Sequence, residues 1–153
     1  MRLNIVVLLG SVRSDRAGIR AARFVESMLA ALYKSADAFV VVTAEYNHSI
    51  PPALSNLLDH FLEEYFWRPS AIVCYSAGQF GGVRAAMRLR AMLCELGMPS
   101  IPSLFPIPRV HDALDEGGHA REGAADRHFA RFASELEWYA AALREQRAVG
   151  VPY

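Results

Sequence analysis

Residues 10–18 carry the side chains whose types and spacing best suit the binding of a phosphate. This segment, Gly-Ser-Val-Arg-Ser-Asp-Arg-Ala-Gly, follows the aliphatic run Leu3–Leu9 and precedes a helical pattern that starts around Ala17. The N–H groups of such a turn and the positive end of the helix dipole attract anions. Further side-chain donors are supplied by Ser11, Arg13, Ser14 and Arg16. The segment predicts a phosphate site, although a polar loop that only links strand to helix would have the same pattern.

Two further segments rich in polar residues and glycine also follow predicted strands. Ala-Glu-Tyr-Asn-His-Ser (44–49) comes after a β-branched run, and Tyr-Ser-Ala-Gly-Gln-Phe-Gly-Gly (75–82) comes after an apolar one. Glycines let a backbone approach a flat ligand closely. In a parallel sheet such loops meet beyond the carboxyl ends of the strands. The three loops together predict one ligand with a phosphate at one end and a planar polar ring at the other. The alternative is three ordinary strand-to-helix connections.

Alternating strand and helix patterns predict the elements that position these loops. Continuous aliphatic runs are typical of parallel strands covered on both faces, and apolar residues three and four positions apart are typical of helices. The predicted strands are Leu3–Leu9, Ala38–Thr43, Ala71–Tyr75 and Ser100–Phe105. Predicted helices begin near Ala17, at Pro52 and near Val83 (ending at Gly97), and the face of a last helix is formed by Phe129, Phe132, Leu136, Tyr139 and Leu143. The fold class is therefore α/β, a doubly wound parallel sheet with helices on both faces, in a single domain over residues 1–153.

Three local features refine this prediction. Pro102 confines the fourth strand to a sheet edge, because proline cannot donate to a central ladder. Residues 111–123 are polar and contain glycine, which predicts a loop. The helix that begins at Pro52 has an apolar stripe broad enough to face a partner subunit as well as the core. This stripe comprises Leu54, Leu57, Leu58, Phe61 and Leu62.

The charge balance favours neither nucleic acid nor a membrane surface as partner. Lys and Arg number 16, as do Asp and Glu, and apolar residues make up 53% of the 153 residues. No apolar run reaches the ~18 residues of a membrane span. The first apolar run leads directly into a polar turn, so it is predicted to be a strand rather than a signal sequence.

Cys74 and Cys94 both lie inside apolar patterns, which favours buried free thiols in a reducing cytoplasm over a disulfide. No arginine follows Cys74 at loop distance, which argues against a phosphatase with a cysteine-centred anion loop. The histidines His111, His119 and His128 are too loosely spaced to predict a metal site.

The three loops together resemble those of the NAD(P)H-dependent FMN reductases of the flavodoxin-like superfamily, a group that includes quinone, chromate and azo-dye reductases. The resemblance rests on GSVRSDRAG, VVVTAEYNHSIPPALSNLLDHF and SAGQFGG, and it covers nearly the whole chain. It implies a flavodoxin-like fold, FMN as cofactor and NADPH or NADH as co-substrate. It also implies a homodimer or homotetramer, with the helix after the middle motif at the interface.

The resemblance further implies which residues bind FMN. The phosphate would be surrounded by Ser11, Arg13, Arg16, Gly18 and Ile19. The isoalloxazine would be lined by Glu45, Tyr46, Asn47 and His48, and along its other side by Ser76, Gly78, Gly81 and Gly82. No catalytic residue or metal ligand is expected, because FMN would carry the chemistry. His48 is the exception to consider, since it could protonate an acceptor, but a role in lining the site is favoured.

Two departures from the family pattern stand out. Ala44 replaces a proline that usually begins the middle motif, which should loosen that loop slightly. Between Val25 and Ala38 the chain also lacks the family's second strand and second helix. A first helix left on its usual face would then make a left-handed crossover, which parallel sheets avoid. Either this helix lies on the other face, or residues are missing near Met28–Tyr33, and the sequence favours the second.

The implied activity is hydride transfer from a nicotinamide to FMN, followed by reduction of a quinone, dye or similar small acceptor. The alternative is a flavodoxin-like electron carrier, or a flavin-binding protein without NAD(P)H turnover. Such carriers are usually more acidic than this chain, in order to dock with redox partners.

Overall fold

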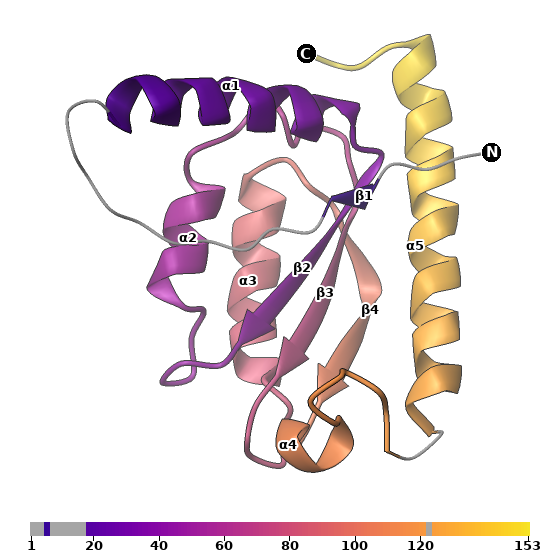
Figure 1. Ribbon diagram of the computed structural model, residues 1–153. Coiled ribbons are helices and arrows are strands. Elements are labelled where there is room, and N and C mark those ends of the chain that lie inside the picture. Colours follow the sequence, from indigo (N-terminus) through magenta and orange to yellow (C-terminus); the bar gives the residue numbers. More distant parts are fainter. Residues whose placement is uncertain (1–4, 7–17, 122–123) are drawn as a thin grey trace.

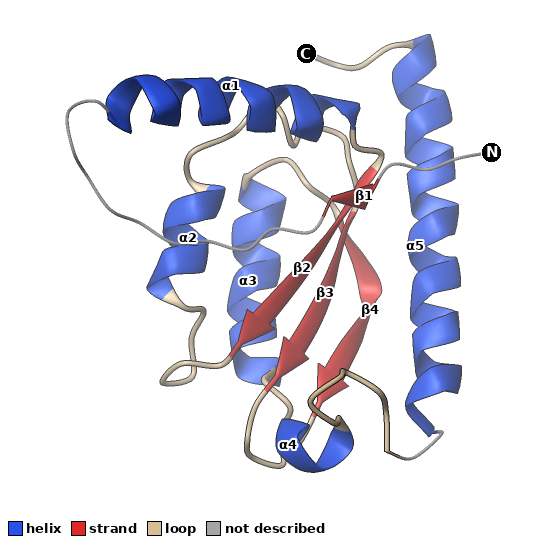
Figure 2. Cartoon of the chain, in the orientation of Figure 1, coloured by secondary structure: helices blue, strands red, loops and turns tan. Residues whose placement is uncertain are grey.

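A computed structural model of the chain shows a parallel sheet with helices on both sides (Figure 1). It describes residues 5–6, 18–121 and 124–153. The elements of this part of the chain are β1 (Ile5–Val6), α1 (Gly18–Ser35), β2 (Ala38–Ala44), α2 (Pro52–Leu58), β3 (Ser70–Tyr75), α3 (Val83–Glu95), β4 (Ser100–Ile107), α4 (Val110–Ala113) and α5 (Ala124–Val149). Strand and helix alternate as far as β4, after which two helices follow (Figure 2).

The sheet has the strand order β1-β2-β3-β4, and every neighbouring pair is parallel. The register places Ala44 beside Tyr75 and Tyr75 beside Ile107, so β2, β3 and β4 end at one edge. The predicted α/β fold with a parallel sheet is confirmed. Of the predicted first strand, Ile5–Val6 form β1 and the other residues lie outside the described part of the chain.

Two apolar clusters cover the two faces of the sheet. On one face Phe39 and Val41 of β2 pack with Leu58 of α2 and Leu89 of α3. On the other face Ala71 of β3 packs with α5, which contributes Phe132, Leu136 and Ala140. Figure 1 shows α2 and α3 on one side of the sheet and α5 on the other. The strands are therefore covered as the continuous apolar runs predict.

Helix α1 runs across the end of the sheet at which the strands begin (Figure 1). Its C-terminal residues enter the cluster on the α2 and α3 side, where Tyr33 is fully buried and Leu29 packs against it. The β1-α1-β2 connection thus moves in the same direction and on the same side as β2-α2-β3, so it has the same hand. The first helix therefore lies on the other face, and it is regular from Gly18 to Ser35. The alternative of missing residues near Met28–Tyr33 stays a prediction.

The predicted edge position of the fourth strand is confirmed, although the strand is longer than predicted. Among the described strands β4 pairs only with β3, and it continues to Ile107. Its register against β3 shifts between the Ser70 and Ile72 pairings, opposite the stretch that holds Pro102. A proline fits such an irregularity because its missing N–H costs no ladder hydrogen bond there.

Three predictions about local structure need correction. Helix α2 ends at Leu58, because the chain turns at Asp59, so Phe61 and Leu62 lie beyond it. Within the predicted loop 111–123, residues 111–113 belong to the short helix α4. Cys74 is buried, but Cys94 is exposed on the outer side of α3, and both are free thiols. Gly97 has φ +80°, which agrees with the predicted end of α3.

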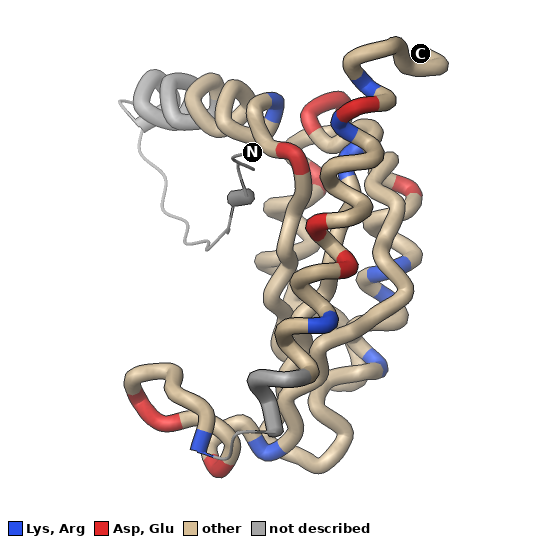
Figure 3. Tube along the Cα trace, turned by 90° about the vertical axis from the view of Figure 1, so that its right-hand side faces the viewer, with Lys and Arg blue, Asp and Glu red and all other residues tan. Residues whose placement is uncertain are grey.

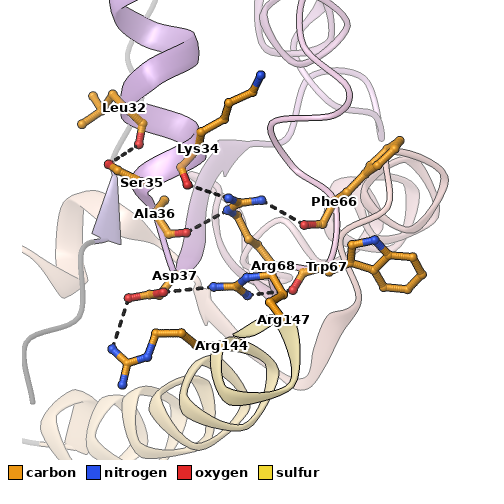
Figure 4. A network of polar contacts seen from close by, with 10 residues as sticks. All are labelled: Leu32, Lys34, Ser35, Ala36, Asp37, Phe66, Trp67, Arg68, Arg144 and Arg147. Carbon is orange, nitrogen blue, oxygen red and sulfur yellow. Dashed lines mark hydrogen bonds and ion pairs between the residues drawn. The ribbon is translucent and has the colours of Figure 1, made fainter. Parts of the chain in front are cut away.

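A group of arginines ties the start of β2 to α5 and to the segment before β3 (Figure 4). The Asp37 carboxylate accepts a hydrogen bond from Arg147 at 3.0 Å and pairs with Arg144 at 3.5 Å. Arg68 donates to the carbonyl oxygens of Lys34, Ala36 and Phe66. Burial lowers the pKa of both Arg68 and Arg147. The side chains of this group hold the two faces together at the end where the strands begin.

Positive and negative residues are mixed over the surface rather than separated into patches of one sign. Both acidic and basic residues occur along the trace of α5 (Figure 3). In the described part of the chain, no helix is both long and apolar enough to cross a membrane.

Candidate functional site

The candidate site lies at the edge of the sheet where β2, β3 and β4 end. The Glu45 N–H donates to the Tyr75 carbonyl over 3.3 Å, and the Ser76 N–H donates to the Ile107 carbonyl over the same distance. The loops that leave these strands therefore begin side by side. Ligands of open parallel sheets bind at this edge.

The loop after β2 is a tight hairpin. The backbones of Tyr46 and Ser49 exchange two hydrogen bonds of 2.9 Å. Asn47 and His48 between them have φ of 49° and 61°, the signature of a type I′ turn. Tyr46, Asn47 and His48 are all exposed. This turn presents three of the four predicted isoalloxazine-lining residues to solvent at the sheet edge.

Glu45, the fourth of these residues, has its carboxylate turned toward α3. Arg84 Nε donates to its Oε1 over 2.8 Å, and Arg84 Nη2 lies 2.6 Å from the same oxygen. Oε2 accepts the Ala85 N–H over 3.4 Å. Gly82 is the N-cap of α3 and has no side chain that could accept a hydrogen bond from the first turn. The Glu45 carboxylate accepts one of these hydrogen bonds instead, from the Ala85 N–H. Its negative charge also suits the positive end of the helix dipole.

These contacts change the ionisation of Glu45. Burial acts to raise the pKa of its carboxyl, but hydrogen bonds from Arg84 and Ala85 and the charge of Arg84 outweigh burial and hold the pKa below its ordinary value. The side chain is only 6% exposed. Glu45 is therefore an ionised group that joins the hairpin to α3.

The loop after β3 is fixed against the end of β4. The Arg109 N–H donates to the Gly78 carbonyl over 3.0 Å, and the Val110 N–H donates to the Ser76 carbonyl over 3.1 Å. A Cβ added at Gly82 would lie 2.8 Å from the Tyr75 oxygen, and one at Gly81 would lie 3.0 Å from the Pro108 nitrogen. These two glycines therefore allow the loop to approach the protein's own backbone.

Gly78 is different, and its surroundings fit a flat ligand. A Cβ there would meet only Ser76 Oγ, at 4.0 Å. Ala77, Gly78 and Gln79 are exposed, and among the described residues nothing accepts a hydrogen bond from their N–H groups. A row of open backbone donors beside the exposed Tyr46 hairpin fits the polar edge of a planar ring such as isoalloxazine. Next to this row, the Arg84 guanidinium lies 5.0 Å from the centre of the Phe80 ring.

The predicted phosphate end falls mainly outside the described residues. Ser11, Arg13 and Arg16 belong to that part of the chain. Gly18 and Ile19 form the start of α1, which crosses the opposite end of the sheet, where the strands begin (Figure 1), so the structure does not bring these two residues to the candidate site. The structure thus brings together the second and third predicted loops, and the first remains a prediction.

Cys74 lies directly beneath the loop after β3 but has no nucleophilic character. Burial, with a smaller contribution from the charge of Glu45, raises the pKa of its thiol to about 11. The thiol is therefore protonated at neutral pH, which argues against thiolate chemistry. Among the described residues, no three His, Cys, Asp or Glu side chains group together in a way that would hold a metal ion.

Sequence reasoning missed Arg84, which links the hairpin to the loop after β3. It lies two residues after the Gly-Gly pair, at the start of a helix, where a basic side chain is unfavourable without an acidic partner. The unfavourable position of Arg84, together with Glu45 directly after β2, was the signal that could have predicted an ion pair between them.

Comparison with solved structures defines the fold class. The flavoenzyme NAD(P)H:(acceptor) oxidoreductase FerB from Paracoccus denitrificans matches with a TM-score of 0.66 at 21% identity, over 82% of this chain and 73% of that one. An oxidoreductase from Corynebacterium diphtheriae matches with a TM-score of 0.64 at 16% identity, over 82% of this chain and 70% of its own. The chain therefore has the flavodoxin-like fold that the sequence predicts.

Sequence comparison then identifies the family. The family model for NADPH-dependent FMN reductase matches residues 27–112, and the chain belongs to this family. An NAD(P)H-dependent FMN reductase of Schizosaccharomyces pombe is 35% identical over 82 residues, which are 54% of this chain and 40% of the relative. An NADPH azoreductase of a Bacillus species is 31% identical over 84 residues, or 54% and 47% of the two chains. The chain thus spans about half or less of these curated relatives.

Proposed function

We propose that this protein is an NAD(P)H-dependent FMN reductase that passes electrons to a quinone, dye or similar small acceptor. The observation that carries the proposal is the edge of the sheet where the exposed residues 46–48 of the hairpin stand beside the open N–H groups of residues 77–79. Membership of the NADPH-dependent FMN reductase family supports the same conclusion.

The protein's own residues would bind and orient the cofactor. The N–H groups of residues 77–79 would donate to the polar edge of the ring, while Tyr46, Asn47 and His48 would line it from the hairpin. Arg13 and Arg16, with Ser11, would hold the phosphate. Glu45 and Arg84 would keep the two loops at a fixed separation. Bound FMN would supply the redox chemistry by accepting hydride from a nicotinamide and reducing the acceptor.

The assembly and location of the protein belong to the same proposal. A homodimer or homotetramer is what the resemblance to the family implies, and the two free thiols fit a reducing cytoplasm. The stripe predicted for the interface is only partly available, because Leu58 and Phe61 are buried and Leu54 packs against the core. Leu62, which is 50% exposed, remains free to contribute to an interface.

Titration of the purified protein with FMN tests the proposal most directly. We expect the flavin spectrum to change on binding, and NAD(P)H to be oxidised when a quinone is added. Arg13→Ala should weaken FMN binding by roughly 1.5–3 kcal/mol, the value of a hydrogen bond to a charged group. Arg88→Ala, an exposed arginine of α3, is the control and should bind FMN as the unchanged protein does. A protein that takes up no FMN would refute the assignment.

A further inference from the structure

A cavity lies beyond the carboxyl end of β4, next to the candidate flavin site. Its volume is about 570 Å³. One wall is formed by Phe105–Pro108 at the end of β4, and another by Asp112 and Ala113 of α4. Leu114 and Arg121 contribute from the segment after α4, and His128 contributes from α5. A cavity of this size falls within the range of small-molecule sites.

Apolar and cationic groups both line this cavity. The apolar surface comes from side chains such as Phe105, Ile107 and Leu114. Among the lining residues that the structure describes, Arg109 and Arg121 bring two positive charges against one carboxylate, that of Asp112, and His128 adds a further nitrogen donor. The lining therefore combines an apolar surface with an excess of positive charge.

The two arginines of the cavity are not used to hold the fold together. Arg68, Arg84 and Arg147 bond carbonyl or carboxylate oxygens of the protein. In contrast, nothing in the described part of the chain accepts a hydrogen bond from the side chain of Arg109 or Arg121. Their guanidinium groups are free to bind a ligand.

The backbone around the cavity is nevertheless well fixed. The Arg109 N–H donates to Gly78, and the Arg109 carbonyl accepts from Asp112 and Ala113. The Arg121 N–H donates to the Ala113 carbonyl over 3.0 Å, and Leu114 pairs with Ala120 in an antiparallel bridge. Arg109 and Arg121 are therefore free at their side chains but held at their backbones, which suits a preorganised site.

We propose that this cavity binds a small organic anion, with its apolar body on the β4 wall and its carboxylate or sulfonate between Arg109 and Arg121. A planar guanidinium bonds a carboxylate through two parallel hydrogen bonds, which gives orientation as well as affinity. The site is separate from the proposed flavin site, because none of the predicted flavin-binding residues that the structure describes lines it. The proposal therefore does not depend on FMN binding.

Calorimetric titration with 2-naphthoate tests this site, with neutral 2-naphthamide and inorganic phosphate as comparison ligands. We expect 2-naphthoate to bind more tightly than either, because only it offers both an apolar body and a negative charge. Arg109→Ala and Arg121→Ala should each weaken its binding by roughly tenfold or more, as the loss of a charge-assisted hydrogen bond implies. Arg88→Ala, which removes an exposed arginine far from the cavity lining, should leave the dissociation constant unchanged.

Several outcomes would overturn the proposal. One is equal affinity for 2-naphthoate and 2-naphthamide, which would show that charge plays no part, and another is phosphate binding as tightly as 2-naphthoate. A third is undiminished binding in Arg121→Ala, whose circular dichroism spectrum should match that of the unchanged protein. The titration is repeated in saturating FMN, where unchanged 2-naphthoate binding supports a separate site and competition contradicts it. A protein that binds 2-naphthoate but no FMN would leave this proposal standing while refuting the proposed function.

Discussion

The Glu45 carboxylate links two of the loops at the carboxyl edge of the sheet. It bonds Arg84 and the Ala85 N–H of α3, and the Arg84 guanidinium lies against the Phe80 ring of the loop after β3. One side chain therefore fixes the position of the hairpin after β2 relative to that loop. This role makes Glu45 a positioning residue of the proposed flavin site.

Replacing Glu45 should make stability depend less on pH. We expect Glu45→Gln to lower the free energy of unfolding by about 1 kcal/mol at neutral pH, because Arg84 is partly exposed and water screens the pair. The folded-state pKa of Glu45 is depressed, so its stabilisation is present above the unfolded pKa of about 4.3 and is lost as the pH falls through the folded value. Urea unfolding at neutral and at acidic pH measures both effects.

Glu137→Gln, on the exposed side of α5, is the matched control and should change stability little at either pH. The interpretation fails if Glu45→Gln is as stable as the unchanged protein at neutral pH. It also fails if the difference between the two proteins persists undiminished in acid.

At the residue scale the sequence predicted correctly that residues of these two loops lie close together. It predicted less well what each of their side chains contacts. Residues 45–48 and 76–82 follow strands, so the parallel sheet alone brings them to one edge. The inward turn of the Glu45 carboxylate depends on Arg84, which is distant in sequence, and no local pattern records that contact. The type I′ turn at Asn47-His48 was equally hidden, because it lacks the glycine that usually marks such turns.

At the scale of elements, the loop after β3 is shaped by Gly82, the N-cap residue of α3. Gly82 has φ +80°, and a Cβ there would lie 2.8 Å from the Tyr75 oxygen and 2.9 Å from the Tyr75 nitrogen. Two separate costs therefore oppose any side chain at this position. One is the left-handed backbone, and the other is the collision with β3.

Gly118 allows these two costs to be separated. It has a nearly identical φ of +79°, yet a Cβ there would meet nothing within 4 Å. Gly118→Ala should thus cost only the left-handed conformation, about 1–2 kcal/mol. Gly82→Ala should cost roughly 1–3 kcal/mol more, because β3 must shift to relieve the overlap. Urea unfolding of the two variants gives the comparison, and equal losses of stability would contradict the collision.

The sequence predicted the long elements well, because their patterns repeat over many residues. The β-branched run of β2 was found to within one residue of its end, and the apolar positions from Phe129 to Leu143 all fall inside α5, which extends beyond them on both sides. Short elements were harder to find. Helix α4 has four residues and begins after Arg109 in a left-handed conformation, and α2 stops at Leu58 although apolar spacing continues to Phe61. Hydrogen bonds from the Arg109 and Val110 N–H groups to the loop after β3 fix the start of α4, and no local pattern records them.

At the scale of the whole molecule, the missing second strand changes where α1 lies. The sequence showed correctly that a helix on the usual face would make a crossover of the wrong hand. The chain avoids this left-handed crossover because Leu29 and Tyr33 of α1 pack on the side of the sheet that α2 and α3 cover. The face beside α5 loses a covering helix as a result, and Val42 in the middle of β2 is 48% exposed.

The group around Asp37 then becomes the main polar connection between the two sides. Asp37 follows α1, while Arg144 and Arg147 come from α5 on the opposite face (Figure 4). Asp37 is 13% exposed and Arg147 is 16% exposed, so solvent screens the pair only weakly. Arg147 also donates to the Trp67 carbonyl over 2.9 Å, which adds the segment before β3 to the same connection.

We expect Asp37→Asn to destabilise the protein by about 3 kcal/mol, because two largely buried guanidinium groups lose their only carboxylate among the described residues. Urea unfolding measures the loss, and amide hydrogen exchange shows where it falls. Exchange should accelerate most in the last turns of α5, since Arg144 and Arg147 attach that end of the helix to the sheet. Glu145→Gln, an exposed substitution on the same helix turn, should stay within about 0.5 kcal/mol of the unchanged protein. If the two variants proved equally stable, or if exchange in α5 did not change in Asp37→Asn, the two faces would have to be held together by their apolar clusters alone.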